Sequence, residues 1–426
     1  MLAGFLLLLA GCQDGQAPTA DSFQVRDSAG IEIVESMTPV WDGDGWTVSG
    51  TPSLVIGRMG GDERYLFGEV AGAVVLRDGR IAVLDGQSAL IRVYTPEGEH
   101  IEDWGGQGEG PGEFTSAQTI SSYRGDSILV SEFVARRLVI FDDRGRFGRS
   151  LVPEMRMSFV TERRARMAEG DRSTVPAESC CRLWGPLRTG AFLLSYPQMV
   201  PNEGSGTKRA SVTAAIMPDS GGAAQSVGVF GGMTYELGLQ GSRSRLQFQP
   251  WFNMVPGPDG YFATQGDSYS IDAYDQSASL KRIIRLARAP RTVTDEIKTA
   301  YEAGLRERLM APGAFIEADS PEEMLDMLLA GPYPSHLPTF FQLLVDPEGN
   351  LWAGQRPYGA GGAGTSDDDQ ASEMNEFFVF GADGRHLGVV ELATDLQVFQ
   401  IGTDFILGTL RDELGVGYVH VYRIEK

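Results

Sequence analysis

Residues 78–84 read Asp-Gly-Arg-Ile-Ala-Val-Leu, a turn signal followed at once by a short apolar strand. Each unit of this kind follows another apolar stretch, so each pair is predicted to form a hairpin with Gly or Asp in its turn. Second hairpins, such as residues 91–104 and 377–390, follow most of them. Two consecutive hairpins make a four-stranded blade of a β-propeller. The pattern occurs six times, which predicts six blades; the other five copies begin at Asp126, Thr189, Asp259, Glu348 and Thr403.

The two ends of this repeat predict how the ring closes. Residues 53–57 (Ser-Leu-Val-Ile-Gly) match residues 101–105, and the glycines and phenylalanine that follow match as well, at an offset of 47 or 48 residues. Residues 53–56 are therefore an outermost strand without a blade before it, and residues 418–424 are a third strand without a fourth. We predict that the N-terminal strand completes the last blade and hides the open sheet edges.

The glycine-rich run Gly105-Gly106-Gln107-Gly108-Glu109-Gly110-Pro111-Gly112-Glu113-Phe114 resembles the blade junction of NHL-type propellers. Together with the strand pattern and the amino-terminal motif Leu9-Ala10-Gly11-Cys12, it makes residues 31–426 resemble the six-bladed β-propeller lipoproteins of bacterial envelopes. The resemblance implies an all-β, NHL-like propeller of four-stranded blades, here with a small helical insertion between blades 4 and 5. It implies no activity, because propellers host unrelated functions.

The amino terminus predicts a lipid anchor. Residues 2–10 are apolar or small, and Leu9-Ala10-Gly11-Cys12 resembles the lipobox of bacterial lipoproteins, although no Lys or Arg precedes the apolar run. The resemblance implies a signal peptide at residues 1–11, lipidation of Cys12 and a tether at residues 12–30. It places the protein in the bacterial cell envelope, on the periplasmic or outer-membrane side, with acyl chains as its membrane anchor.

Composition excludes some partners. The chain has 57 Asp and Glu against 36 Lys and Arg, a formal net charge of −21, which argues against nucleic acid as a ligand. An apolar fraction of 42% is that of a folded protein, and no apolar run is long enough to span a bilayer as a helix.

We expect the protein to be a monomer.

Long insertions indicate which face of the propeller binds ligands. One face of the propeller contains the loops that lead into the first strand of each blade and the loops that join second to third strands. We name it the looped face. The tight Asp-Gly turns lie on the opposite face. Residues 152–179 are rich in arginine (Arg156, Arg163, Arg164, Arg166, Arg172), and could bind an anionic group or only face solvent. Residues 287–335 predict two helices, one after Thr294 and one capped by Ser320. Residues 354–375 contain Asp367-Asp368-Asp369, which lack the spacing of a Ca²⁺ loop.

Counting blades places ten ligand-binding candidates on the looped face, and functional loops are often long ones on a rigid scaffold. Trp251 could equally be a core aromatic. The ten are Glu113, Glu132, Arg136, Arg182, Trp251, Asp267, His336, Arg356, Asp395 and Asp412.

The adjacent Cys180 and Cys181 could form a vicinal disulfide at the rim of this face, or be two buried thiols. Quinone-dependent oxidation would rest on this pair alone, which is similar to the vicinal pair of quinoprotein dehydrogenases, and those enzymes have eight blades.

Two function hypotheses remain. The first is a binding module for a peptide, a protein or a saccharide, with no catalytic residue and no cofactor. The second is a hydrolase or lactonase that holds Ca²⁺ or another divalent cation with carboxylates at the tunnel mouth, of which Glu69 is a further candidate. The chain has only four histidines, which disfavours a histidine-ligated metal.

Overall fold

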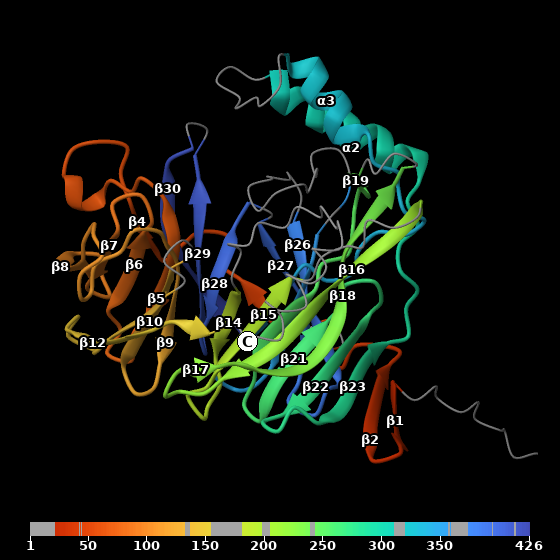
Figure 1. Ribbon diagram of the computed structural model, residues 1–426, viewed down its shortest axis with the longest axis horizontal. Helices are drawn as coiled ribbons and strands as arrows, with labels where there is room; N and C mark the ends of the chain where they lie inside the picture. Colours follow the sequence, from red (N-terminus) through yellow and green to blue (C-terminus); the bar gives the residue numbers. More distant parts are fainter. Residues whose placement is uncertain are drawn as a thin grey trace, which may run out of the picture.

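The computed structural model describes residues 22–41, 43, 45–132, 137–154, 181–197, 205–238, 243–310, 320–356, 358, 374–393, 395–412 and 415–426. Most of these residues lie in antiparallel β-strands, and two α-helices stand at one end of the molecule (Figure 1). The all-β character expected from the turn-strand repeat is therefore confirmed, and the arrangement of the sheets described below is that of a propeller-type fold.

The first two sheets are four-stranded meanders whose strands follow chain order. The first sheet follows the 3-10 turn η1 (Glu63–Tyr65) and contains β5 (Val70–Val75), β6 (Ile81–Asp85), β7 (Leu90–Tyr94) and β8 (His100–Gly105). The second contains β9 (Ala117–Tyr123), β10 (Ser127–Glu132), β11 (Arg137–Phe141) and β12 (Phe147–Leu151). Each corresponds to the two consecutive hairpins that the sequence predicts.

The third sheet departs from this plan because it contains one very long hairpin. Its strands are β14 (Arg182–Pro186), β15 (Phe192–Pro197), β16 (Gly206–Met217), β18 (Gln225–Leu237) and β19 (Arg243–Arg245). A separate two-stranded parallel pair joins β13 (Pro153–Glu154) to β17 (Gly222–Ala223). The β16–β18 hairpin runs diagonally across Figure 1 toward the end where the helices stand.

The fourth sheet contains strands from two distant parts of the chain. Its local strands are β20 (Asn253–Pro256), β21 (Gly260–Thr264), β22 (Ser270–Asp275) and β23 (Leu280–Leu286). The hairpin of β1 (Phe23–Ser28) and β2 (Ile31–Ser36) extends it, with β2 parallel to β23. Residues 23–30, expected to be tether, thus belong to a strand and its turn, because β2 offers them a backbone partner.

The fifth and sixth sheets complete the set of large sheets in the described chain. The fifth contains β24 (Gln342–Val345), β25 (Leu351–Gln355), β26 (Met374–Phe380) and β27 (His386–Ala393). The sixth contains β28 (Gln397–Ile401), β29 (Phe405–Arg411), β30 (Gly417–Glu425), β3 (Thr47–Val48) and β4 (Leu54–Ile56). The pairing expected for residues 53–56 is present, since Ile56 faces Val419 and Leu54 faces Val421.

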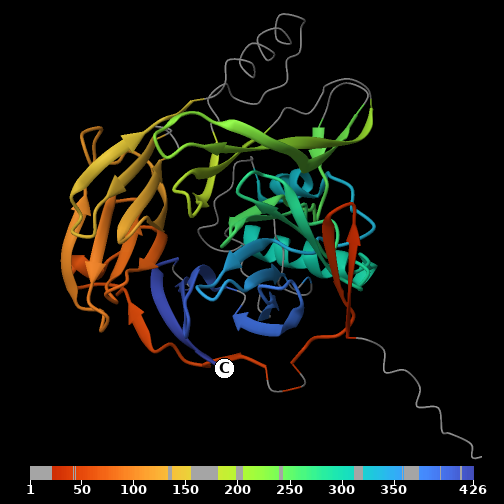
Figure 2. The same ribbon diagram turned by 90° about the horizontal axis from the view of Figure 1, so that it is seen from below.

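The hydrophobic core is divided into clusters that lie between successive sheets. Five clusters join the first sheet to the second and so on to the sixth. A further cluster joins Leu407 and Val419 of the sixth sheet to Val83 and Tyr94 of the first. The sheets therefore follow one another around a closed ring, in the colour order that Figure 2 shows.

Residues 22–57, here named the strap, run along the outer edges of three successive sheets. The strap adds β1 and β2 to the fourth sheet, and the amide of Trp41 donates to Leu387 O at the outer edge of the fifth. Trp41 stacks near Trp46, which approaches Trp352 of the fifth sheet, before β3 and β4 join the sixth. Figure 2 shows this segment in red along the lower rim. Edge amides and carbonyls that would otherwise be unpaired are thereby satisfied.

The two helices expected between residues 287 and 335 are α2 (Asp295–Met310) and α3 (Pro321–Leu329). The Ser320 hydroxyl accepts a hydrogen bond from the Glu323 amide, which caps α3 as its sequence predicts. Tyr301 and Leu305 of α2 are buried against Phe248, so the helices are anchored to the loop that precedes β20.

Candidate functional site

Nine of the ten candidate residues belong to the described chain; Arg136, Cys180 and most of the arginine-rich segment 152–179 lie outside it, as does Cys12. All nine lie in or beside segments that begin a first strand or follow a second strand. These strand ends are neighbours in an antiparallel pair, as the Asn253–Thr264 and Gln342–Gly354 pairings show.

Glu132 serves the fold rather than a ligand. Its side chain is fully buried and accepts a hydrogen bond from the Thr115 amide at 2.7 Å. Arg137 forms an ion pair with it at 2.7 Å and donates to the carbonyl of Glu113. Because a buried carboxylate needs these partners, Glu132 is not available to a ligand.

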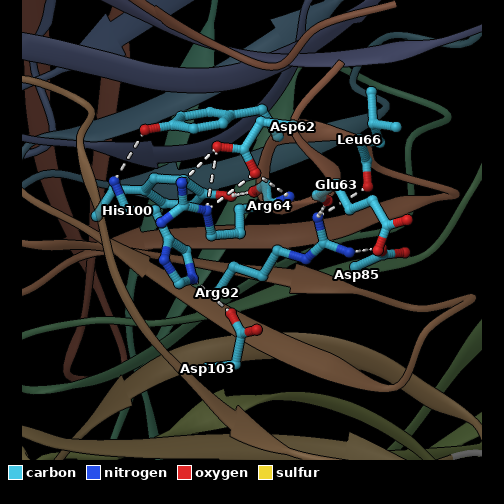
Figure 3. Close-up of polar contacts among 10 residues, drawn as sticks. Asp62, Glu63, Arg64, Leu66, Asp85, Arg92, His100 and Asp103 are labelled. Carbon is cyan, nitrogen blue, oxygen red and sulfur yellow. Dashed lines mark hydrogen bonds and ion pairs between the residues drawn. The ribbon is translucent and has the colours of Figure 1, made fainter. Parts of the chain in front are cut away.

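Asp85 has the equivalent place in the first sheet, at the end of β6. Its carboxylate accepts from the amides of Glu69 and Gln87 and forms an ion pair with Arg92 at 3.5 Å. Arg92 also donates to the carbonyls of Glu63 and Leu66, as Figure 3 shows. This arginine fixes the loop that begins β5, and Glu132 and Arg137 do the same for β9.

Two other candidate carboxylates shape their own loops. The Asp412 carboxylate accepts from the Val416 amide and the Tyr418 hydroxyl. The Glu113 carboxylate accepts from the Gly110 amide at 2.9 Å. The sequence could not distinguish such turn carboxylates from ligand-binding ones.

Arg182 and Asp395 stand apart from the other candidates. The Arg182 guanidinium lies over the Trp184 ring, 4.3 Å from its centroid, and Asp395 is exposed before β28. Cys181 is half-buried against the cluster between the second and third sheets.

The remaining four candidates converge where the fourth and fifth sheets meet. The Thr339 amide and hydroxyl donate to the carbonyls of Gly266 and Ser268, which flank Asp267. Gly266 has a φ of +70°, and a Cβ there would lie 2.8 Å from the carbonyl oxygen of Trp251. Only glycine fits this close approach without strain. Asp267 forms an ion pair with Arg209 of β16 at 2.7 Å.

His336 and Arg356 reach the same junction through Arg291. His336 forms an isolated antiparallel bridge with Thr292, and the Leu337 amide donates to Arg291 O. The Arg291 guanidinium donates to the backbone carbonyl of Arg356 at 2.6 Å. These backbone and side-chain contacts, between residues far apart in the sequence, hold Arg291 beside the end of β25.

Three arginines here each lie on an aromatic ring. Arg291 is 5.5 Å from the centroid of Tyr358, and Arg356 is 4.7 Å from that of Phe341. Arg288 is 5.2 Å from the centroid of Tyr269. We name Arg288, Arg291 and Arg356, with these three rings, the arginine cluster. Sequence reasoning missed Arg288, Arg291 and Tyr358, because only the fold brings their segments together.

Hydrogen-bonding capacity in the arginine cluster is partly unused. Arg291 Nε and the neighbouring Gln355 Oε1 are buried and have no hydrogen-bond partner among the described residues. Gln355 Nε2, by contrast, donates to the Tyr269 hydroxyl at 2.6 Å. Within the described ranges, no carboxylate lies within 4.0 Å of Arg288, Arg291 or Arg356, whereas Arg92 and Arg137 are both paired.

The pKa of Tyr358 is influenced by the positive charge of this cluster. Burial raises the pKa of its hydroxyl, and the charges of Arg356 and Arg291 act in the opposite direction. Both guanidiniums are therefore close enough to the phenol to influence it. Tyr358 also packs edge-to-face on Phe248, whose ring centroid is 5.2 Å away, and so connects the cluster to the helices.

Metal binding finds no support in the part of the chain that is described. Among those residues, no group of three or more His, Cys, Asp and Glu side chains could hold a metal ion. Asp367, Asp368 and Asp369 lie outside them. No described helix is long and apolar enough to cross a membrane.

Comparison with known proteins gives structural similarity only. No family model matches the chain, and no curated protein matches it. A DUF4221 family member from Bacteroides vulgatus has 8% identity and a TM-score of 0.49, over 89% of this chain and 99% of its own. A Bacteroides fragilis protein described as exported has 11% identity and a TM-score of 0.43, over 92% and 99%. Virginiamycin B lyase from Staphylococcus aureus has 7% identity and a TM-score of 0.38, over 90% and 100%.

These values are too low to transfer an activity to this chain. The propeller-type fold follows from the strand pairing and the ring of clusters themselves.

Proposed function

We propose that this protein is a lipid-anchored lipoprotein of the bacterial envelope whose six-bladed propeller binds a ligand at its looped face. The lipobox at residues 9–12 supports the anchor, with Cys12 as the lipidated residue. The six large sheets and the clusters between them support six blades, with β4 closing the last one. The ligand would be a saccharide, a peptide or a segment of a protein.

The observation that carries the binding site is the convergence at the junction of the fourth and fifth sheets. Trp251, Asp267, His336 and Arg356 belong to four separate loops. Backbone and side-chain hydrogen bonds of Thr339 and Arg291 join the loops of the last three, and Gly266 packs closely against the backbone of Trp251. Trp251 is 39% exposed, which leaves much of its ring available to a ligand. An exposed aromatic side chain among polar groups on a rigid scaffold is typical of a binding site.

A matched pair of exposed aromatics tests this site. Trp251 is 39% exposed, and Phe147, at the start of β12 beside a tight turn of the opposite face, is 38% exposed. The full chain with Cys12→Ser, which removes the anchor, would be screened on glycan and peptide arrays, and then compared as Trp251→Ala and Phe147→Ala variants.

We expect Trp251→Ala to weaken binding of the array ligands at least about tenfold and Phe147→Ala to leave it unchanged. Binding that survives Trp251→Ala, or that Phe147→Ala weakens equally, would place the site elsewhere. Binding to no member of either array would argue against a ligand-binding function.

A further inference from the structure

Several arginines elsewhere in the described fold are already paired with carboxylates. The Arg124 and Arg149 guanidiniums both pair with Asp219, and Arg80, Arg146 and Arg385 pair with aspartates of their own turns. These pairs hold turns in place. The arginine cluster differs because three arginines lie close together on aromatic rings, and none of the three pairs with a carboxylate among the described residues.

Arg291 and Arg356 have hydrogen-bond donors to spare. A guanidinium carries five N–H donors in a planar fork. Arg291 uses one nitrogen for the Arg356 carbonyl, and its Nε is buried with no partner in the part of the chain that is described. Arg356 donates no side-chain hydrogen bond within the described ranges, where its guanidinium lies over Phe341. Stacking on a ring occupies the face of a guanidinium and leaves the edge, with its donors, available.

An oxyanion is the group that this arrangement recognises best. Carboxylates and phosphates accept two parallel hydrogen bonds from a guanidinium fork, and these charge-assisted bonds are stronger than neutral ones. A guanidinium with unused donors gains free energy when an anion accepts hydrogen bonds from them.

The charge of the whole chain limits the size of the anion. With a formal net charge of −21, the protein repels polyanions at long range. Arg288, Arg291 and Arg356 concentrate positive charge locally, and the nearby Asp267 is already paired with Arg209. The ligand therefore has one or two oxyanion groups rather than a chain of them.

We infer that Arg291 and Arg356 bind the oxyanion group of a small ligand, with Arg288 adding positive charge across Tyr269. This inference rests on the proposed function, whose looped-face site includes Arg356, and it specifies the chemical class of the ligand. Acidic saccharides and phosphorylated small molecules share this chemistry.

Two probes distinguish the two sources of the oxyanion. Binding of D-glucuronate and of inorganic phosphate to the full chain with Cys12→Ser would be measured by calorimetry at constant ionic strength, with D-glucose as the neutral control. The same protein would be labelled with an arginine-specific dicarbonyl reagent, and labelled residues would be identified by mass spectrometry. Labelling needs no substitution in the cluster, so it is informative even if a variant fails to fold.

We expect at least one anion to bind and to slow the labelling of Arg291 and Arg356 about fivefold or more, while D-glucose does neither. Arg356→Gln should weaken that binding at least about tenfold. Arg144→Gln is the matched control, because Arg144 is exposed in the turn between β11 and β12 and has no carboxylate partner among the described residues.

If neither anion protects the cluster, the inference is wrong. If the array ligands nevertheless depend on Trp251, the proposed function stands with an uncharged ligand; if they do not, both fail. Protection of Arg144 to the same extent would show general screening of charge and would also overturn the inference.

Discussion

The hydroxyl and the amide of Ser53 both donate hydrogen bonds to the backbone carbonyl of Val421, which lies 368 residues further along the chain. This contact belongs to the closure of the ring, where β4 lies against β30. The C-terminal part of the strap therefore completes the last sheet. Folding of this contact requires that nearly the whole chain has come together, because closing such a long loop is entropically costly.

The closure predicts a large effect of Ile56 on stability. Ile56 is 1% exposed and packs in the cluster between the sixth and first sheets, so Ile56→Ala should lower the free energy of unfolding by about 2 to 5 kcal/mol. Val55 precedes it and is 46% exposed, so Val55→Ala should change the free energy by less than about 0.5 kcal/mol. Urea unfolding followed by fluorescence measures both, and equal effects at the two positions would contradict this account of the closure.

The buried pair of Asp85 and Arg92 predicts a second large effect. Asp85→Ala leaves the Arg92 guanidinium, 9% exposed, without its carboxylate, which should cost about 3 to 5 kcal/mol in the free energy of unfolding. Asp126→Ala removes an exposed pair with Arg77 and should cost less than about 1 kcal/mol. A loss below 1 kcal/mol for Asp85→Ala would show that water or other groups compensate Arg92.

His386 predicts how stability depends on pH. Burial, together with the positive charge of Arg288, lowers its pKa from 6.5 to about 4, although its hydrogen bond to Gly388 O acts in the opposite direction. The unfolded chain therefore binds more protons between pH 6.5 and pH 4, and stability falls as the pH falls through this window. At pH 4.5 the folded state should have lost about 2 to 3 kcal/mol through this residue relative to pH 7.5.

Comparison with His386→Phe isolates this contribution, since Phe378 and Phe380 surround the ring. When the pH is lowered from 7.5 to 4.5, the free energy of unfolding of the wild type should fall by about 2 to 3 kcal/mol more than that of the variant. If the free energies of unfolding of the two proteins change equally with pH, the histidine does not titrate as inferred.

The lipobox predicts that Cys12 carries the anchor. Cys12→Ser should move the protein from the membrane fraction to the soluble fraction and abolish its labelling with radioactive palmitate. Cys181→Ser is the control and should leave both unchanged, because Cys181 is half-buried in the propeller. Membrane association that persists in Cys12→Ser would require a different attachment.

Local sequence patterns were sufficient to predict the strands and their turns. The Asp78-Gly79-Arg80 turn has Gly79 at a φ of +89°, and Asp78 accepts from the Arg80 amide, as the Asp-Gly signal indicates. The spacing of Tyr301, Leu305 and Leu309 predicted α2 for the same reason, since helical periodicity is visible within a few turns.

The strap shows where local patterns were insufficient. Residues 23–30 read as a polar tether, yet they form β1 and its turn, because β2 at the edge of the fourth sheet pairs with β1. On its other side, β2 pairs in parallel with β23, which comes from the middle of the chain. No local sequence pattern specifies a parallel pairing over that separation. Only the repeat that aligns residues 53–57 with residues 101–105 signalled a contact between the two ends.

The sequence by itself determined the hairpins, the helices and the closing strand. Turn residues and apolar periodicity act over a few residues, and the internal repeat can be recognised by aligning the chain with itself. The tertiary structure alone decided which polar residues are free for function. Glu132 and Arg356 look alike as charged residues after a second strand, but one is buried against Arg137 and the other lies over Phe341 without a carboxylate beside it in the described chain. Burial and pairing depend on segments that meet only in the folded ring, since desolvation and Coulomb interactions are set by distance in space, not along the chain.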